Sequence, residues 1–176
     1  MVIKLIESPT EEDMLACKQR ALVTMGRDTT APPTSEWLHR ILRARHSPIR
    51  RLCFSFYLEI PSWIATHLAR HVHAQPYIQS QRNDRQNDYD RRKAPQDAIV
   101  KMILDVNAEE LINIANKRLC RMAADETREV VTEMCKLAGE AFPPIESELV
   151  PVCVRNGHTC YEMNGCGRCS SPENDA

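Results

Sequence analysis

The sequence has no surplus of charge of either sign. Its 176 residues carry 23 Lys and Arg against 24 Asp and Glu, which gives a formal net charge of −1. Proteins that coat nucleic acid need an excess of Lys and Arg over the whole surface. Aromatic residues make up only 5% of the chain, and no stacking platform for bases is visible. Both features argue against nucleic acid as a partner, although a local basic pocket remains compatible with them.

Long apolar runs and a leader segment are also missing. No apolar stretch approaches the roughly 20 residues that cross a bilayer, so we expect no membrane span. Residues 1–12 lack a basic segment followed by an apolar one, so we expect no secretory signal and a cytoplasmic location. In that reducing compartment the eight cysteines are expected to be thiols or metal ligands rather than disulfides.

The chain is long enough for one domain with a hydrophobic core. The patterns predict an α+β fold in which a few strands, mostly N-terminal, form a mixed sheet with helices packed against it. We expect strands at 2–6 and 52–60. Helices are expected after Thr10, at 35–45 and at 62–72. Two more are expected further on, one that starts at Asn107 and one that ends at Pro143-Pro144. The charged stretch 73–95 is typical of a solvated loop. We therefore divide the chain into a domain at 1–149 and a tail of different composition at 150–176.

An Arg-His pair ends the helix expected at 62–72, and a Ser-x-Arg follows in the loop behind it. The residues are Arg70, His71, Ser80 and Arg82. A guanidinium offers two parallel donors and a hydroxyl adds a third, so such a set can hold a phosphate. By themselves these residues are equally compatible with a plain basic surface loop.

The same residues resemble the signature of the flavin-dependent thymidylate synthases, Arg-His-Arg-x-x-Ser-x-Asn-x-x-Ser-x-Arg. The sequence has the first two and last two fixed positions of that signature. It departs from the other three, where it has Val72, Gln75 and Tyr77. The flanking blocks decide whether this partial match is meaningful.

Two flanking blocks support the resemblance, and with the signature they cover roughly residues 45–142 in the family's order. Upstream, Ser47-Pro48 precedes a strand, as a Ser-Pro-Phe-Glu-His segment does in the family. Downstream, Asn107-Ala108 opens a helix that contains Arg118, and this is similar to the family's Asn-Ala-Arg start and Leu-x-Leu-Arg centre. We interpret the chain as a divergent, compact member of this family.

The resemblance implies a fold like that of the thymidylate synthase-complementing proteins and an enzyme of dTMP biosynthesis. In the family, a one-carbon unit passes from methylenetetrahydrofolate to carbon 5 of dUMP, with FAD as cofactor and NADPH as reductant. Matched by position, Ser80, Arg82 and Arg118 would bind dUMP, with Arg118 as the catalytic residue. Arg70 and His71 would contact the flavin. The resemblance also implies a homotetramer whose active sites are built from several subunits.

The departures leave two alternatives open. Arg50 and Arg51 replace the acidic residue and the histidine of the upstream block, and Arg45 or His46 stands near the histidine ahead of the family's Ser-Pro. Altered charge beside the flavin would be compatible with hydroxymethyl-dUMP as the product instead of dTMP. A second hypothesis is a zinc-stabilised nucleotide-binding protein that keeps the fold but has lost redox chemistry.

The tail is rich in cysteine and glycine. Cys153, Cys160, Cys166 and Cys169 fall within seventeen residues, and His158 lies among them. A Cys-x-x-Cys knuckle at 166–169 lets two sulfurs reach one ion, so the four thiolates predict a tetrahedral zinc site, with His158 as a substitute ligand. An iron–sulfur cluster and a disordered tail with incidental thiols are the alternatives. The other four cysteines, at 17, 53, 120 and 135, are expected in the core.

Overall fold

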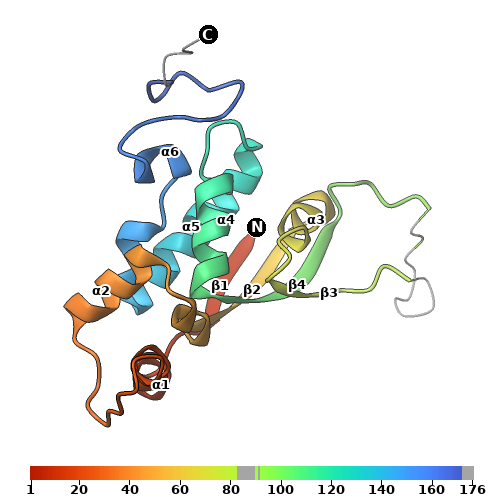
Figure 1. Cartoon of the computed structure of the whole chain (residues 1–176). Helices are drawn as coiled ribbons and strands as arrows, with labels where there is room; N and C mark the ends of the chain where they lie inside the picture. The colour runs from red at the N-terminus through yellow and green to blue at the C-terminus, as the bar shows by residue number, and fades with distance from the viewer. Residues whose placement is uncertain (83–89, 91, 172–176) are drawn as a thin grey trace.

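The computed structural model describes residues 1–82, 90 and 92–171. Its sheet contains β1 (Val2–Glu7), β2 (Cys53–Pro61), β3 (Gln75–Ile78) and β4 (Ile99–Asn107), in the order β1-β2-β4-β3 (Figure 1). Every neighbouring pair of strands is antiparallel. The α+β class is therefore confirmed, but the sheet is antiparallel throughout its described strands and not mixed.

The helices follow the predicted order. They are α1 (Glu11–Val23), α2 (Ser35–Ala44), α3 (Ser62–Ala69), α4 (Ala108–Arg118), α5 (Asp125–Ala141) and α6 (Val152–Arg155), with 3₁₀ turns η1 (Ser47–Arg51) and η2 (Pro143–Glu148). The predicted cap Thr10 is confirmed, and Thr34 caps α2 in the same way. Helix α3 ends at Ala69, so Arg70 and His71 lie just beyond its last turn.

Two strands lie where the sequence interpretation assigned none. Strand β3 interrupts the stretch taken as a solvated loop, and its Pro76 is tolerated because β3 is an edge strand. Strand β4 pairs with β2 over nine residues, from Cys53↔Asn107 to Pro61↔Ile99. Three of the four described strands thus lie in the first 78 residues, whereas β4, which pairs between β2 and β3, comes later in the chain.

One face of the sheet forms the core. Alternate side chains of β2 and β4 are buried, namely Phe54, Phe56, Leu58, Ile60, Val100, Met102, Leu104 and Val106. Helix α3 contacts β2, β3 and β4, while α4 contacts β4 and α5 contacts β1. Cys17 and Cys135 are buried as expected. Cys53 is exposed and Cys120 is half-buried and outside the core, so the expectation of core positions is wrong for these two.

Figure 1 shows two segments that extend from this body. The described residues between β3 and β4, 79–82, 90 and 92–98, form an arm that projects away from the helices. The tail, drawn in dark blue, lies at the same end of the molecule as the turn that follows α4. Among the described residues, no helix is both long and apolar enough to cross a membrane.

Thr10 offers a test of the fold outside the site. Its hydroxyl accepts a hydrogen bond from Asp13 N at 3.2 Å, and the Asp13 carboxylate accepts from Thr10 N at 3.0 Å. Thr10→Ala should lower the free energy of unfolding by about 1 kcal/mol, the usual cost of losing an N-cap. Urea denaturation measures this loss. Thr132→Ala is the matched control, because the Thr132 hydroxyl bonds only within α5, and it should change stability by less than about 0.5 kcal/mol.

Candidate functional site

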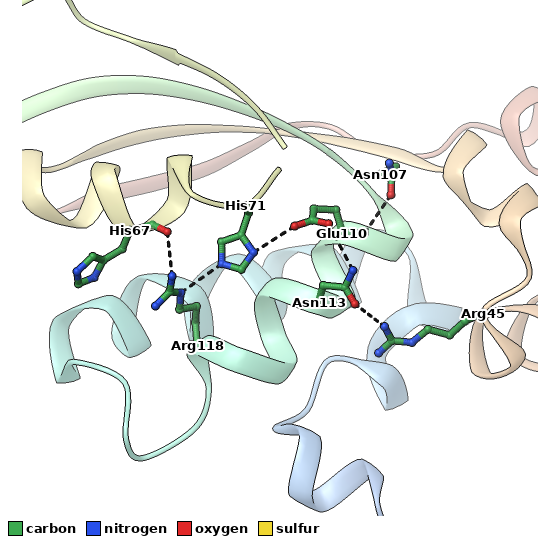
Figure 2. Close-up of polar contacts among 7 residues, drawn as sticks. All are labelled: Arg45, His67, His71, Asn107, Glu110, Asn113 and Arg118. Atoms are coloured by element: carbon green, nitrogen blue, oxygen red, sulfur yellow. Dashed lines mark hydrogen bonds and ion pairs between the residues drawn. The ribbon is translucent and has the colours of Figure 1, made fainter. Parts of the chain in front are cut away.

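The site is built on α4, whose first turn is fixed by its own cap. The Asn107 side chain accepts a hydrogen bond from Glu110 N at 3.0 Å. Figure 2 shows Glu110 and Arg118 directed toward His71, in the turn after α3, while Asn113 lies between Glu110 and Arg45. Glu110 is only 4% exposed. A carboxylate so deeply buried requires partners, and the network described below supplies them.

His71 lies between Glu110 and Arg118 and contacts both. Its Nδ1 is 3.1 Å from Glu110 Oε1, and its Nε2 is 3.2 Å from Arg118 Nε. An arginine can only donate, so Nε2 must accept and the ring proton must lie on Nδ1, where it is donated to Glu110. The arrangement therefore defines one neutral tautomer of His71.

Burial is the main cause of a lowered pKa for His71, and the charge of Arg118 acts in the same direction. Glu110 opposes both by its charge and its hydrogen bond, without cancelling them. His71 is thus neutral near pH 7. In this state it orients Arg118 and does not serve as an acid.

Arg118 is held from two directions. Besides its bond to His71, its NH2 group donates to the His67 carbonyl at 3.1 Å. Its NH1 group makes no hydrogen bond to any part of the chain that the structure describes. Burial, and next the charge of Arg70, lower the pKa of Arg118, but arginine stays charged at any physiological pH. Within the described residues, Arg118 is thus an oriented cation whose NH1 group has no hydrogen-bond partner.

A second arginine extends the network to α2. Arg45 donates to Asn113 Oδ1 at 2.6 Å and to Asn116 Oδ1 at 2.7 Å, while Asn113 donates to Glu110 Oε2 at 3.4 Å. Arg45 has a left-handed backbone, with φ 54°, and its Nε is buried without a partner in the described chain. His46 instead lines a groove between α1 and α2. Of the two residues near the family's histidine position, Arg45 is thus the one in this network.

The two arginines that depart from the family pattern hold η1 in place. Arg50 forms an ion pair with Glu109 at the start of α4, and Arg51 pairs with Asp13 of α1 at 2.8 Å. Glu109 stands where the family has the arginine of its Asn-Ala-Arg block. The reversed charge at Arg50 is therefore matched by a reversed charge on the neighbouring helix.

The structure brings some of the expected site residues together and separates others. Arg70, His71 and Arg118 gather at the ends of α3 and α4. Ser80 and Arg82 follow the end of β3, and Arg82 N donates to Ser80 Oγ at 3.4 Å. No hydrogen bond or ion pair among the described residues joins Ser80 or Arg82 to Arg118. A single chain thus presents two parts of the expected nucleotide site.

In the described part of the tail, residues 158–170 form a small loop after α6. Cys160 N donates to Ser170 O at 2.8 Å, and Cys169 Sγ lies 3.9 Å from His158 Nδ1. Burial and then a hydrogen bond with Cys169 raise the pKa of the Cys153 thiol. Within residues 1–82, 90 and 92–171, however, no three His, Cys, Asp or Glu side chains are arranged to hold a metal ion.

A hollow of about 750 Å³ lies in the groove between α1, α2 and η1. Its lining includes Arg20, Trp37, Arg40 and His46. None of the site residues expected from the sequence lies in it. Size alone therefore does not identify the site, and the polar network on α4 does.

The lowered pKa of His71 predicts a dependence of stability on pH. The unfolded chain takes up a proton at this histidine near pH 6.5, while the folded protein resists it. The free energy of unfolding should thus fall as the pH drops below about 6.5 toward the lower folded pKa. Urea denaturation at several pH values should show a smaller dependence in His71→Gln than in wild type. The same change at exposed His73 should leave the dependence as it is.

Comparisons with known proteins agree with this picture. The family model described as thymidylate synthase complementing protein matches residues 83–144, a range that includes all of α4. The fold is similar to that in the crystal structure of a UMP/dUMP methylase, PolB from Streptomyces cacaoi, bound with 5-Br dUMP. The TM-score is 0.65 at 14% identity, over 84% of this chain and 93% of that chain. No curated protein sequence gives a significant match. The two findings confirm the resemblance drawn from the sequence.

Proposed function

We propose that this chain, a divergent member of the flavin-dependent thymidylate synthase group, transfers a one-carbon unit to carbon 5 of dUMP. The observation that supports this best is Arg118. It lies within the segment matched by the family model and at the position of the arginine in the family's Leu-x-Leu-Arg block. It is also fixed by His71 and the His67 carbonyl, and its NH1 group has no hydrogen-bond partner within the described residues.

Arg118 is the proposed catalytic residue. Transfer of carbon to position 5 of a uracil places negative charge on the ring oxygens, and a pre-oriented guanidinium stabilises that charge without reorganisation. Neutral His71 keeps the guanidinium in position by accepting from Nε. Glu110 in turn accepts from His71 and fixes its tautomer.

The proposed flavin site is only partly matched by the residues present. Arg70 is exposed at the end of α3, makes no hydrogen bond to the described chain and adds positive charge beside Arg118, which suits an anionic cofactor such as FAD. His71 does not fit as a direct flavin contact, because Glu110 and Arg118 occupy both its ring nitrogens. A bound flavin would carry reducing equivalents from NADPH. Methylenetetrahydrofolate is the proposed one-carbon donor, and hydroxymethyl-dUMP is the alternative product.

The division of the nucleotide site supports the proposal of a homotetramer. Ser80 and Arg82 lie on the arm, and Arg118 lies at the end of α4. A site that uses all three residues would form if the arm of one subunit reached the α4 end of another. Sedimentation equilibrium should then give four times the 20.1 kDa chain mass.

We further propose that the tail, residues 150–176, binds zinc through Cys153, Cys160, Cys166 and Cys169. In support, Cys153 and Cys169 are already in contact, and His158 adjoins Cys169. The side chains of Cys160 and Cys166 would have to turn toward Cys153 and Cys169 to complete a tetrahedral set.

Elemental analysis of protein purified without chelators should find about one zinc per chain. The double variant Cys166→Ser and Cys169→Ser should contain no zinc. The control variant Cys135→Ser, whose cysteine is buried in α5, should contain as much zinc as wild type. Protein that carries no metal would refute the zinc proposal and would leave the proposed activity intact.

The activity is tested by anaerobic incubation with dUMP, methylenetetrahydrofolate, FAD and NADPH, followed by mass spectrometry of the nucleotide. A gain of a methyl or hydroxymethyl group at carbon 5 is expected. If dUMP binds but is recovered unchanged, the alternative of a nucleotide-binding protein without redox chemistry replaces the enzyme. If dUMP does not bind, both proposals fail.

A further inference from the structure

A hollow of about 450 Å³ lies where the C-terminal end of α4 meets the tail. The α4 side contributes Lys117 and Arg118, and the turn behind it contributes Met122. The tail contributes the consecutive residues Glu162, Met163 and Asn164. Figure 1 shows the dark blue tail at the same end of the molecule as the turn after α4. The tail thus forms one wall of a hollow that contains the proposed catalytic residue.

The charges around this hollow suit an anion. Two adjacent cations, Lys117 and Arg118, face a single carboxylate, that of Glu162. The ion pair between Lys117 Nζ and Glu162 Oε1 is 2.9 Å long, but the two side chains are 64% and 46% exposed. A pair so open to solvent is weak, so Lys117 can turn to the phosphate of a ligand. Arg118 also lines the hollow and adds its positive charge there.

The uncharged part of the lining suits a flat polar ring. Met122 is 60% exposed and Met163 fully exposed, and thioether side chains adapt to the faces of planar groups. The Asn164 amide has one acceptor and two donors. These match the N3–H and O4 groups on the edge of a uracil. A hollow of this size is also within the usual range for small-molecule sites, roughly 300–1,000 Å³.

We propose that the tail segment Glu162-Met163-Asn164 is the specificity-determining wall of the nucleotide site. In this arrangement Lys117 attracts the phosphate of a pyrimidine nucleoside monophosphate, Arg118 contacts the ring, and Asn164 recognises uracil by its N3–H and O4 edge. The inference rests on the proposed function, because it takes Arg118 as a nucleotide-binding residue. It assigns the tail a role in substrate choice that metal binding alone would not give it.

The test compares the affinities of the full chain for dUMP and dCMP by calorimetry. Asn164→Ala should weaken dUMP binding by at least fivefold and reduce the preference for dUMP over dCMP. Asn164→Asp should weaken dUMP binding further, because a carboxylate still accepts from uracil N3–H but repels O4. Asn156→Ala is the matched control, since Asn156 is an exposed tail residue that does not line the hollow.

The outcomes separate this inference from the proposed function. If Arg118→Ala weakens dUMP binding while both Asn164 variants bind dUMP and dCMP as wild type does, the tail is no part of the nucleotide site and the inference is overturned. If Arg118→Ala also binds dUMP normally, the proposed function fails at its site. A larger loss of dUMP affinity in Asn164→Asp than in Asn164→Ala, with an unchanged circular dichroism spectrum, would support the inference, because a merely structural role of the tail does not predict it.

Discussion

Arg118→Ala is expected to weaken dUMP binding by about 10- to 150-fold, which corresponds to the loss of one charge-assisted hydrogen bond of roughly 1.5–3 kcal/mol. The guanidinium is oriented by His71 Nε2 at 3.2 Å and by the His67 carbonyl at 3.1 Å. A cation held in this way loses little conformational freedom when the ligand binds, so its contribution to affinity should be close to the full value of the bond.

Titration calorimetry on the full chain measures the effect, and circular dichroism confirms that the variant is folded. The Arg118→Lys variant should also bind dUMP weakly. A lysine ammonium group cannot reproduce the planar geometry by which the guanidinium donates to His71 Nε2, to the His67 carbonyl and to a ligand at once. Arg43→Ala is the matched control, as Arg43 is exposed on α2 and its side chain has no hydrogen bond in the described chain. Equal dUMP affinity in wild type and Arg118→Ala would remove Arg118 from the site.

The fold was predictable where local chemistry sets it. Thr10 caps α1 as expected, because a hydroxyl that satisfies a free backbone N–H lies only three residues from that N–H in the sequence. Strand β4 was missed although its sequence does alternate. Val100 and Met102 are buried on one side and Lys101 is exposed on the other, but the outward Ile103 hides the period. Ile103 pairs with Tyr57 of β2, a long-range contact that no local pattern encodes.

The site was predictable in part, for a similar reason. The motif spacing identified His71 and Arg118, which the structure joins by a hydrogen bond. It did not identify Glu110, the residue that fixes His71. The available signal was an acidic residue in the first turn of a helix whose neighbouring positions are apolar. Such a residue is usually attributed to the helix dipole, and only the placement of α3 beside α4 turns it into a buried partner.

The tail shows where sequence reasoning alone stops. The spacing of its cysteines predicts a metal site, and the fold of the tail brings Cys153, Cys169 and His158 near one another. The contact between the tail and α4 depends instead on Lys117 and Glu162, which are 45 residues apart. No motif contains both residues, so the hollow they share became visible only in the folded chain.

Glu110→Ala should lower the free energy of unfolding by about 2–4 kcal/mol. The carboxylate is 4% exposed and accepts from His71 Nδ1 and from Asn113 Nδ2. Its removal leaves two donors in the interior without an acceptor, and each such group costs roughly 1–3 kcal/mol. Urea denaturation measures the loss. Glu133→Ala is the control, because Glu133 is 41% exposed and pairs only with Lys136 of the same helix at 3.7 Å, so a change below about 0.5 kcal/mol is expected.

Glu110→Gln distinguishes the structural role of this residue from its effect on the ligand. The amide retains the shape and one acceptor oxygen, so the loss of stability should be smaller than in Glu110→Ala. The negative charge is lost, however, and that charge opposes the lowering of the His71 pKa. The His71 pKa in this variant should therefore fall further, which an NMR titration of the ring can follow. Because the tautomer of His71 is then less well fixed, Arg118 should be held more loosely and dUMP should bind more weakly. If Glu110→Gln instead leaves both the histidine titration and dUMP affinity as in wild type, Glu110 does not act on Arg118 through His71.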